Sequence, residues 1–298
     1  MIQLGSYSSD FEMEYFDAVC KVIKEDNKKK EIIKSCKKIL PYDFFKGSEN
    51  DLIEEFKLLI LAPFKELKRA EKYIRDNTIS IMKTECFDKV YEAYELVAKS
   101  IKNGFSMRVR IVKNAGLTVC PYCNRDYINC RAENVSGAQL DHFFSRSEFP
   151  LFSICLYNLV PVCGNCNRIK GGQDKEFVSP FDDKINWQKD ITFYYRPITL
   201  EDAEIVVCGK GNLKNNIREM RIDEAYQIHI SEVLELREKL QTYNETQRQE
   251  FQEVLSKVEL TDLQIKKSIF GPEITKESML TKPLGKMMSD LHKEMGIY

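Results

Sequence analysis

Several features that would define a protein class are missing from this sequence of 298 residues. No apolar run is long enough to span a membrane, and the first ten residues lack the basic start and apolar core of a signal peptide. We therefore expect a cytoplasmic protein with no membrane partner. The net charge is −1 and the pI is near 6.4, which argues against a general binder of polyanions. A nucleic-acid partner would need a local basic patch.

The sequence also lacks internal repeats, low-complexity segments and the glycine-rich motifs that bind phosphate groups. Histidine is rare, since the chain holds only His142, His229 and His292. The length allows two or three modest domains. We expect a mainly α protein with a small α+β insert. The predicted division is a helical N-terminal domain at 1–105, the insert at 106–185, and a β-hairpin with long helices at 186–298.

Cysteine, in contrast, is abundant, and four of the ten cysteines form two Cys-x-x-Cys pairs. Zinc favours four thiolates in a tetrahedron, and each such pair directs two sulfurs at one point. Because cysteine fills all four positions, no coordination site is left for water, and the expected zinc is structural. The alternative is four unrelated free thiols. The paired residues are Cys120, Cys123, Cys163 and Cys166, and the remaining six are expected to be reduced, mostly core thiols.

Between the two pairs and directly after the second lie residues suited to phosphodiester hydrolysis. Asp141 precedes His142, and the amides Asn158 and Asn167 follow. A neutral imidazole can take a proton from water, while hard oxygen ligands hold Mg²⁺ against a phosphate. Asp141 and the side-chain carbonyl of Asn167 are suitable ligands of that kind. The pattern therefore favours catalysis between the knuckles and not at the zinc.

Residues 120–172 resemble the HNH endonuclease family, which has a ββα-metal core and paired zinc knuckles. On this resemblance, Asp141 is the metal-binding acid, His142 is the general base, and Asn158 braces the catalytic loop. Asn167 takes the place of the final metal ligand, and Lys170 matches a lysine one helical turn later. The resemblance implies a metal-dependent endonuclease that uses Mg²⁺ or Mn²⁺, with DNA favoured as substrate and RNA possible. It implies a ββα-metal core clamped by the zinc site and flanked by helical segments.

A weaker resemblance concerns HNH effectors of bacterial anti-phage systems of the Septu and retron type. It rests on the run that begins at Leu140 and on the segment that ends in the second knuckle. This resemblance implies a role in antiviral defence and a protein partner such as an ATPase. The alternative function is a zinc-stabilised module that binds nucleic acid or protein without hydrolysis.

Residues 99–115 hold five basic residues and no acid, and they lead directly into the first knuckle. They form the best candidate for a nucleic-acid patch, although a solvated helix end would give the same pattern. The candidate substrate-binding residues are Arg108 and Arg110 in this patch, with Arg168 and Lys170 after the second knuckle.

The N-terminal part predicts helices separated by short breaks. A mixed-charge run at 24–31 is expected to be a solvated turn. Asp51 begins a capping-box pattern that opens a helix, and Pro63 should end or kink that helix. A further helix is expected to continue through Ile101 and to close at Gly104.

In the central part, strands are expected at 138–143 and 157–162, followed by a helix at 164–170. Successive side chains on a regular strand point to opposite faces. Asp141 and His142 could then not both face one phosphate, so we expect the backbone to depart from a regular strand at this point.

In the C-terminal part, strands at 191–195 and 204–208 are expected to pair, and Asp223 is expected to cap a long helix. Its apolar stripe, which continues to Val258, is more typical of a core face than of a dimer seam. The tail after Gly285 is a candidate docking surface for the partner, because it carries Met287, Met288, Leu291 and Met295. Packing of this tail on the chain itself is the alternative.

Overall fold

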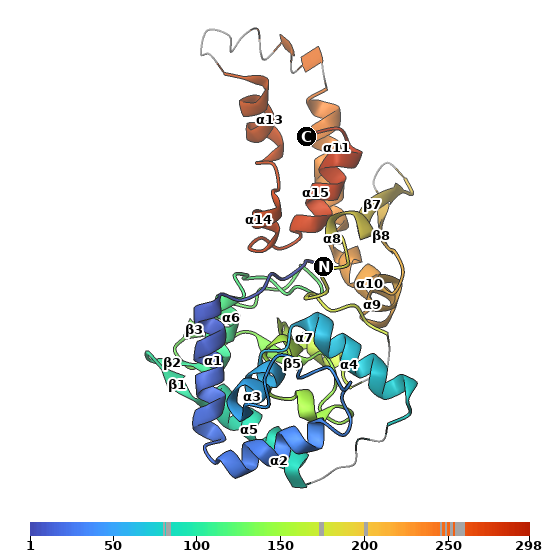
Figure 1. The fold of residues 1–298 in the computed structure, drawn as a ribbon. Helices are drawn as coiled ribbons and strands as arrows, with labels where there is room; N and C mark the ends of the chain where they lie inside the picture. The colour runs from blue at the N-terminus through green and yellow to red at the C-terminus, as the bar shows by residue number, and fades with distance from the viewer. Residues whose placement is uncertain are drawn as a thin grey trace.

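In the computed structural model, helices α1 to α7 gather in one body, and α11, α13 and α15 extend away from it (Figure 1). The fold is mainly helical, with four small two-stranded antiparallel sheets in the part of the chain that is described. The structure describes residues 1–79, 81, 85–172, 176–199, 202–244, 246–247, 249–250, 253 and 260–298.

Local capping rules set where the N-terminal helices begin. The Ser8 hydroxyl accepts the backbone N–H of Phe11 at the start of α1, and the Asp51 carboxylate accepts two backbone N–H groups at the start of α3. Pro63 separates α3 from α4, as predicted. The helices are α1 (Ser9–Val22), α2 (Asp26–Cys36), α3 (Leu52–Ile60), α4 (Phe64–Asp76) and α5 (Glu85–Lys99).

The prediction of a solvated turn at 24–31 is wrong, because α2 begins at Asp26. Most charged residues of this helix are exposed, whereas Lys29 is buried and forms an ion pair with Asp26. Ile32, Ile33 and Cys36 are buried on its inner face, where α2 packs against α3 and α5. Burial of that apolar face stabilises a helix whose first turns look solvated in the sequence.

The prediction that the fifth helix continues through Ile101 is also wrong. Helix α5 ends at Lys99, and a hairpin of β1 (Ile101–Lys102) and β2 (Phe105–Ser106) follows. Its turn residues, Asn103 and Gly104, have φ angles of 52° and 81°. Asn-Gly favours these left-handed conformations and a tight hairpin, so Gly104 closes a turn and not a helix.

The central part contains a strand pair followed directly by a helix. Strands β5 (Gln139–His142) and β6 (Leu159–Val162) pair in antiparallel register, and α7 (Gly164–Lys170) packs against β5. These elements agree with the predicted strands and helix, and Gly171 ends α7 with a φ of 53°. The neighbouring elements are α6 (Met107–Asn114), β3 (Cys130–Ala132), β4 (Val135–Ser136) and the 3₁₀ turns η1 (Pro150–Phe152) and η2 (Leu156–Asn158).

The C-terminal part contains the predicted hairpin and several shorter helices. Strands β7 (Ile191–Pro197) and β8 (Ala203–Gly209) pair in antiparallel register, and α15 (Gly285–Glu294) packs against β7. The remaining elements are α8 (Trp187–Asp190), α9 (Leu213–Glu219), α10 (Ile222–Tyr226), η3 (Gln227–His229), α11 (Ile230–Thr242), α13 (Asp262–Phe270) and α14 (Lys276–Met279).

Two C-terminal predictions need correction. Asp223 does not cap a long helix, because it lies inside the short helix α10, which η3 joins to α11. The tail does not offer its apolar face for docking, because Met287 and Leu291 are fully buried against the chain itself. The predicted continuation of the apolar stripe at Phe251, Val254 and Val258 lies outside the described residues.

One large apolar core extends through all three predicted domain ranges. It includes Tyr15 from the first range, Tyr122 from the second and Phe193 from the third. This continuity joins the helical body to the hairpin through the knuckle region. In the described part of the chain, we find no helix that is both long and apolar enough to cross a membrane.

Candidate functional site

The four paired cysteines come together in one buried cluster. Their sulfur atoms all lie within 4.8 Å of one another. Tetrahedral zinc with Zn–S bonds of about 2.3 Å requires sulfurs about 3.8 Å apart, which fits this spacing. The described cysteines are free of disulfides. The cluster can therefore hold a metal ion such as zinc.

The local backbone explains how the cluster forms. Cys163 is the N-cap of α7, and its sulfur accepts the backbone N–H of Cys166 at 3.4 Å. In the first pair, the backbone N–H of Asn124 donates to the carbonyl of Cys120 at 2.7 Å. Asn124 has a φ of 52°, which turns the chain back after the second sulfur.

The thiols of this cluster influence one another strongly. Burial raises the pKa of the Cys120 thiol. Hydrogen bonds with the Cys120, Cys163 and Cys166 thiols lower the pKa of Cys123. A cluster in which neighbouring thiols already stabilise one thiolate is chemically suited to a divalent cation, which binds sulfur as thiolate.

Asp141 and His142 lie on β5, which stays regular through both positions. Asp141 pairs with Val160 and His142 with Leu159 on β6. The prediction that the backbone departs from a regular strand here is therefore wrong. Cross-strand pairing to β6 keeps the backbone of β5 regular. The side chains of Asp141 and His142 therefore contact different neighbours.

The Asp141 carboxylate is buried and contacts two polar side chains. It accepts the Tyr122 hydroxyl at 2.6 Å and lies 3.1 Å from the Lys170 ammonium. Lys170 is only 3% exposed and also donates to the carbonyls of His142 and Phe143. Lys170 is therefore the internal counter-ion of Asp141, and its charge is directed toward the protein and away from solvent.

The imidazole of His142 is half-buried between a backbone carbonyl and an aromatic ring. Its Nε2 lies 3.1 Å from the carbonyl oxygen of Ser153, and its ring centroid lies 4.4 Å from that of Tyr94. Burial lowers the pKa of His142 to about 3, and the charge of Arg146 adds to this shift. Because a carbonyl only accepts, Nε2 carries the proton and Nδ1 keeps its lone pair.

Asn158 is completely buried and holds the loop that follows β5. Its Oδ1 accepts the N–H of Phe144 at 2.8 Å, and its Nδ2 donates to the carbonyls of Phe144 and Phe152. These three hydrogen bonds agree with the bracing role expected from the sequence.

Asn167 lies on α7 and donates from Nδ2 to Gln139 at 2.7 Å. This bond fixes the amide and leaves its Oδ1 oxygen available as an acceptor or metal ligand. Arg168 is exposed on the same helix and contacts Asn165.

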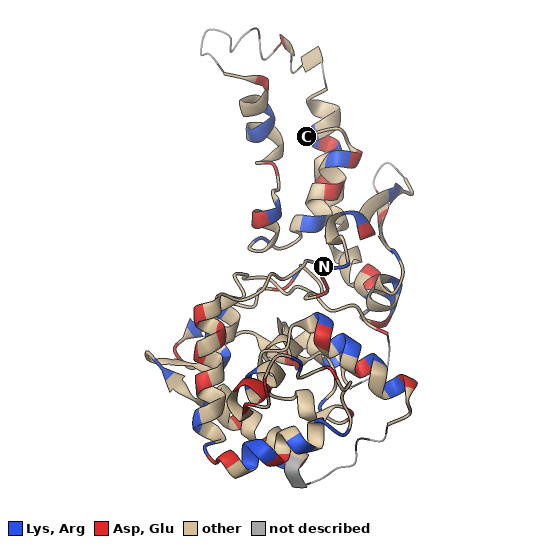
Figure 2. Cartoon of the chain, in the orientation of Figure 1, with Lys and Arg blue, Asp and Glu red and all other residues tan. Residues whose placement is uncertain are grey.

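Two basic residues of α6 interact with side chains of other helices. Arg110 forms an ion pair with Glu14 of α1. Burial raises the pKa of Tyr94 on α5, and the nearby charge of Arg108 opposes this rise. Figure 2 shows acidic and basic residues interspersed along α1, α2 and α4, so the two signs of charge are mixed on these helices.

Asp141, His142 and Asn167 line one open cavity of about 570 Å³. Part of the cavity wall was not predicted from the sequence, because Asp88 and Tyr91 come from α5 and Arg146 comes from the loop after β5. A basic residue four positions after His142 was the available signal for Arg146. Nothing in the local pattern of α5 indicates that this helix reaches the site.

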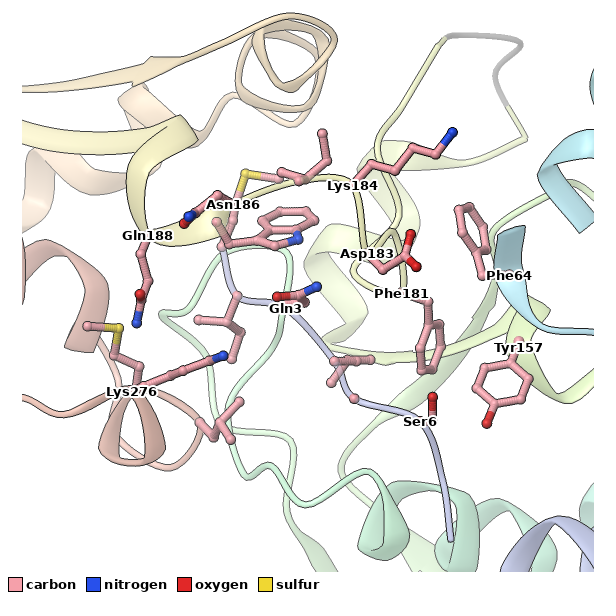
Figure 3. A pocket seen from close by; sticks show the side chains of 18 of the residues that line it. Gln3, Ser6, Phe64, Tyr157, Phe181, Asp183, Lys184, Asn186, Gln188 and Lys276 are labelled. Carbon is pink, nitrogen blue, oxygen red and sulfur yellow. The ribbon is translucent and has the colours of Figure 1, made fainter. Parts of the chain in front are cut away.

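A larger groove of about 760 Å³ lies elsewhere, between the N-terminal segment and the C-terminal elements (Figure 3). Phe64, Tyr157 and Phe181 lie at one end of it and Gln188 and Lys276 at the other. None of the predicted site residues lines this groove. Its lysines at 65, 184 and 276 are exposed surface residues.

Comparisons with protein-family models, curated proteins and solved structures find no significant match to this chain. The resemblance to HNH endonucleases therefore rests on the residues quoted above and stays a prediction.

Proposed function

We propose that this protein is a metal-dependent endonuclease of the HNH type that hydrolyses phosphodiester bonds in nucleic acid, with DNA favoured over RNA. The observation that carries the proposal is the shared cavity of Asp141, His142 and Asn167. The strand pair and helix that present these residues have the order of a ββα-metal core. A neutral base beside two oxygen ligands is the combination that hydrolysis of a phosphodiester requires.

His142 acts as the general base in this proposal. Its Nδ1 lone pair takes a proton from a water molecule, and the water oxygen attacks phosphorus while the opposite P–O bond breaks. The Ser153 carbonyl fixes the tautomer of His142, which leaves the Nδ1 lone pair available to accept a proton. Asn158 holds the adjoining loop, so the base keeps its position.

Asp141 and the Oδ1 atom of Asn167 would hold Mg²⁺ or Mn²⁺. Such a cation supplies stabilisation of the charge that develops on the phosphate and leaving oxygens. Lys170 and Tyr122 orient the Asp141 carboxylate through an ion pair and a hydrogen bond. Zinc at the four cysteines has a structural role, because the sulfurs complete its coordination.

The role in anti-phage defence and the ATPase partner are a further proposal that rests on the resemblance alone. The C-terminal tail offers little apolar surface for docking, since Met287 and Leu291 are buried and Met288 and Met295 are partly buried. Adjacent genes in the source genome would test this part, because an ATPase encoded beside this chain would support it.

The experiment incubates plasmid DNA and RNA with the purified protein in Mg²⁺, Mn²⁺ or EDTA. We expect cleavage with either cation and none with EDTA. His142→Ala should lower the cleavage rate by about 10²- to 10⁴-fold, because it removes the general base. His229→Ala is the matched control, since His229 is half-buried but lies outside the cavity.

Wild-type cleavage by the His142→Ala protein would refute the assigned base. Binding of nucleic acid without cleavage by the wild-type protein would favour the alternative, a zinc-stabilised binding module.

A further inference from the structure

Arg146 is held against one face of α5 by aromatic and acidic side chains. Its guanidinium carbon lies 4.4 Å from the ring centroid of Tyr91 and 5.5 Å from that of Tyr94. Its Nη1 atom lies 3.5 Å from Glu95. Tyr94 and Glu95 lie three and four residues after Tyr91 on the helix, so both neighbour Tyr91 on the side that faces the arginine. Stacking on tyrosine fixes the plane of a guanidinium without using its hydrogen-bond donors.

The same arginine lies close to the proposed base. The ring centroid of Tyr94 lies 4.4 Å from that of His142 and 5.5 Å from the guanidinium carbon of Arg146. One tyrosine therefore packs against both side chains. Arg146 and His142 also line the same cavity. The Nη1 atom of Arg146 is buried and makes no hydrogen bond.

Among the described residues that line this cavity, Arg146 is the single lysine or arginine. Lys170 is nearby, but its charge is neutralised by the ion pair with Asp141. Asp88 adds a negative charge to the cavity wall. A polyanionic substrate entering this cavity therefore meets one partly exposed cation, whose ion-pair partner Glu95 is also partly exposed, unlike the buried pair of Lys170 and Asp141. A planar guanidinium can donate two parallel hydrogen bonds to the non-bridging oxygens of a phosphate.

We infer that Arg146 binds a backbone phosphate of the substrate beside the scissile bond, and that α5 forms the second wall of the active site. The inference rests on the proposed nuclease function and names a residue and a helix that the sequence pattern did not assign. Contact with a phosphate carries no base specificity, so Arg146 contributes affinity and position for any sequence. Tyr91 is the positioning residue for Arg146, since its ring packs against the guanidinium group.

The test compares Arg146→Gln and Arg146→Lys with the wild-type full chain. On an oligonucleotide substrate, Arg146→Gln should raise KM by about 10- to 100-fold, since it removes a charge-assisted contact. Arg146→Lys should recover part of the loss, because it keeps the charge without the fork of donors. Tyr91→Ala should give a smaller rise in KM than Arg146→Gln.

A second readout separates phosphate binding from a structural effect. In the His142→Ala background, binding of a fluorescent oligonucleotide is measured between low and high salt. Arg146→Gln should reduce the slope of log K against log salt by about one unit, as expected for one lost phosphate contact. Arg237→Gln is the matched control, because Arg237 also lies over a tyrosine ring and has a buried Nη1 without a hydrogen bond, outside the cavity.

The outcomes distinguish this inference from the proposed function. If the wild-type protein cleaves nucleic acid but Arg146→Gln keeps its KM and salt slope, the role of Arg146 is refuted and the nuclease assignment stands. If the wild-type protein neither cleaves nor binds nucleic acid, the proposed function fails and the inference fails with it.

Discussion

At the scale of single residues, Asn158 determines the path of the loop between β5 and η1. Its amide satisfies one backbone N–H and two backbone carbonyls that would otherwise be buried without partners. The loop it holds carries Arg146 and leads to Ser153, whose carbonyl fixes the His142 tautomer. One buried amide therefore positions two groups of the candidate site.

Replacing Asn158 by alanine should lower the free energy of unfolding by on the order of 2–4 kcal/mol, because three backbone groups lose their partners. Asn165→Ala should change it by less than about 0.5 kcal/mol, because Asn165 is exposed on α7. Chemical denaturation of the two variants and the wild-type protein measures both values. Equal stability of the two variants would contradict the bracing role.

At the scale of elements, α7 connects the cysteine cluster to the candidate active site. Cys163 caps this helix, and Cys166, Asn167 and Lys170 follow at spacings of three, four and seven residues. Residues at these spacings share one helical face. A seven-residue helix is too short to be stable alone, so its position depends on tertiary contacts and on whatever the cysteines bind.

Cys163→Ser should remove the bound metal and disorder α7 with it. Structural zinc contributes about 10–16 kcal/mol of apparent binding free energy in small zinc domains, which is comparable with the stability of a whole domain. We expect about one zinc ion per wild-type chain by elemental analysis and a large fall in Tm for the variant.

Cys208→Ser is the control, because Cys208 is an exposed thiol far from the cluster in sequence. It should keep both the zinc content and the Tm. A wild-type protein without zinc, or a Cys163→Ser variant with an unchanged Tm, would contradict the structural role of the metal.

At the scale of the whole molecule, the first knuckle joins the helical body to the C-terminal elements. The Asn124 side chain donates to the carbonyl of Met279 at 2.9 Å and accepts the N–H of Lys286 at 2.8 Å. The Tyr226 hydroxyl donates to the carbonyl of Cys123 at 2.6 Å. The knuckle is thus a structural junction as well as a candidate metal site.

Asn124→Ala should speed amide hydrogen exchange in residues 276–298 by about 5- to 30-fold, the factor that corresponds to a loss of 1–2 kcal/mol. Asn103→Ala is the matched control, because Asn103 has the same φ of 52° but lies exposed in the β1–β2 turn. It should carry similar backbone strain without changing exchange in the C-terminal residues. Unchanged protection of 276–298 in Asn124→Ala would show that the knuckle does not stabilise this region.

Local signals in the sequence were sufficient for much of the core. The spacing of the four cysteines predicted their cluster, and the residues at 164–170 predicted α7 with its observed bounds. Asp51 predicted a helix start, because capping depends on atoms within three residues. The charged start of α2 led to the wrong prediction of a turn at 24–31, because only tertiary burial shows which face of this helix is apolar.

Contacts between residues far apart in the chain were decided by the tertiary structure alone. No periodicity relates Tyr91 on α5 to Arg146 in the loop after β5, yet packing brings them together at the cavity. Lys170 became the counter-ion of Asp141, and Leu291 became part of the core, by the same kind of long-range packing. Short-range rules fix which residues can perform chemistry, whereas burial and the path of the whole chain decide which of them meet.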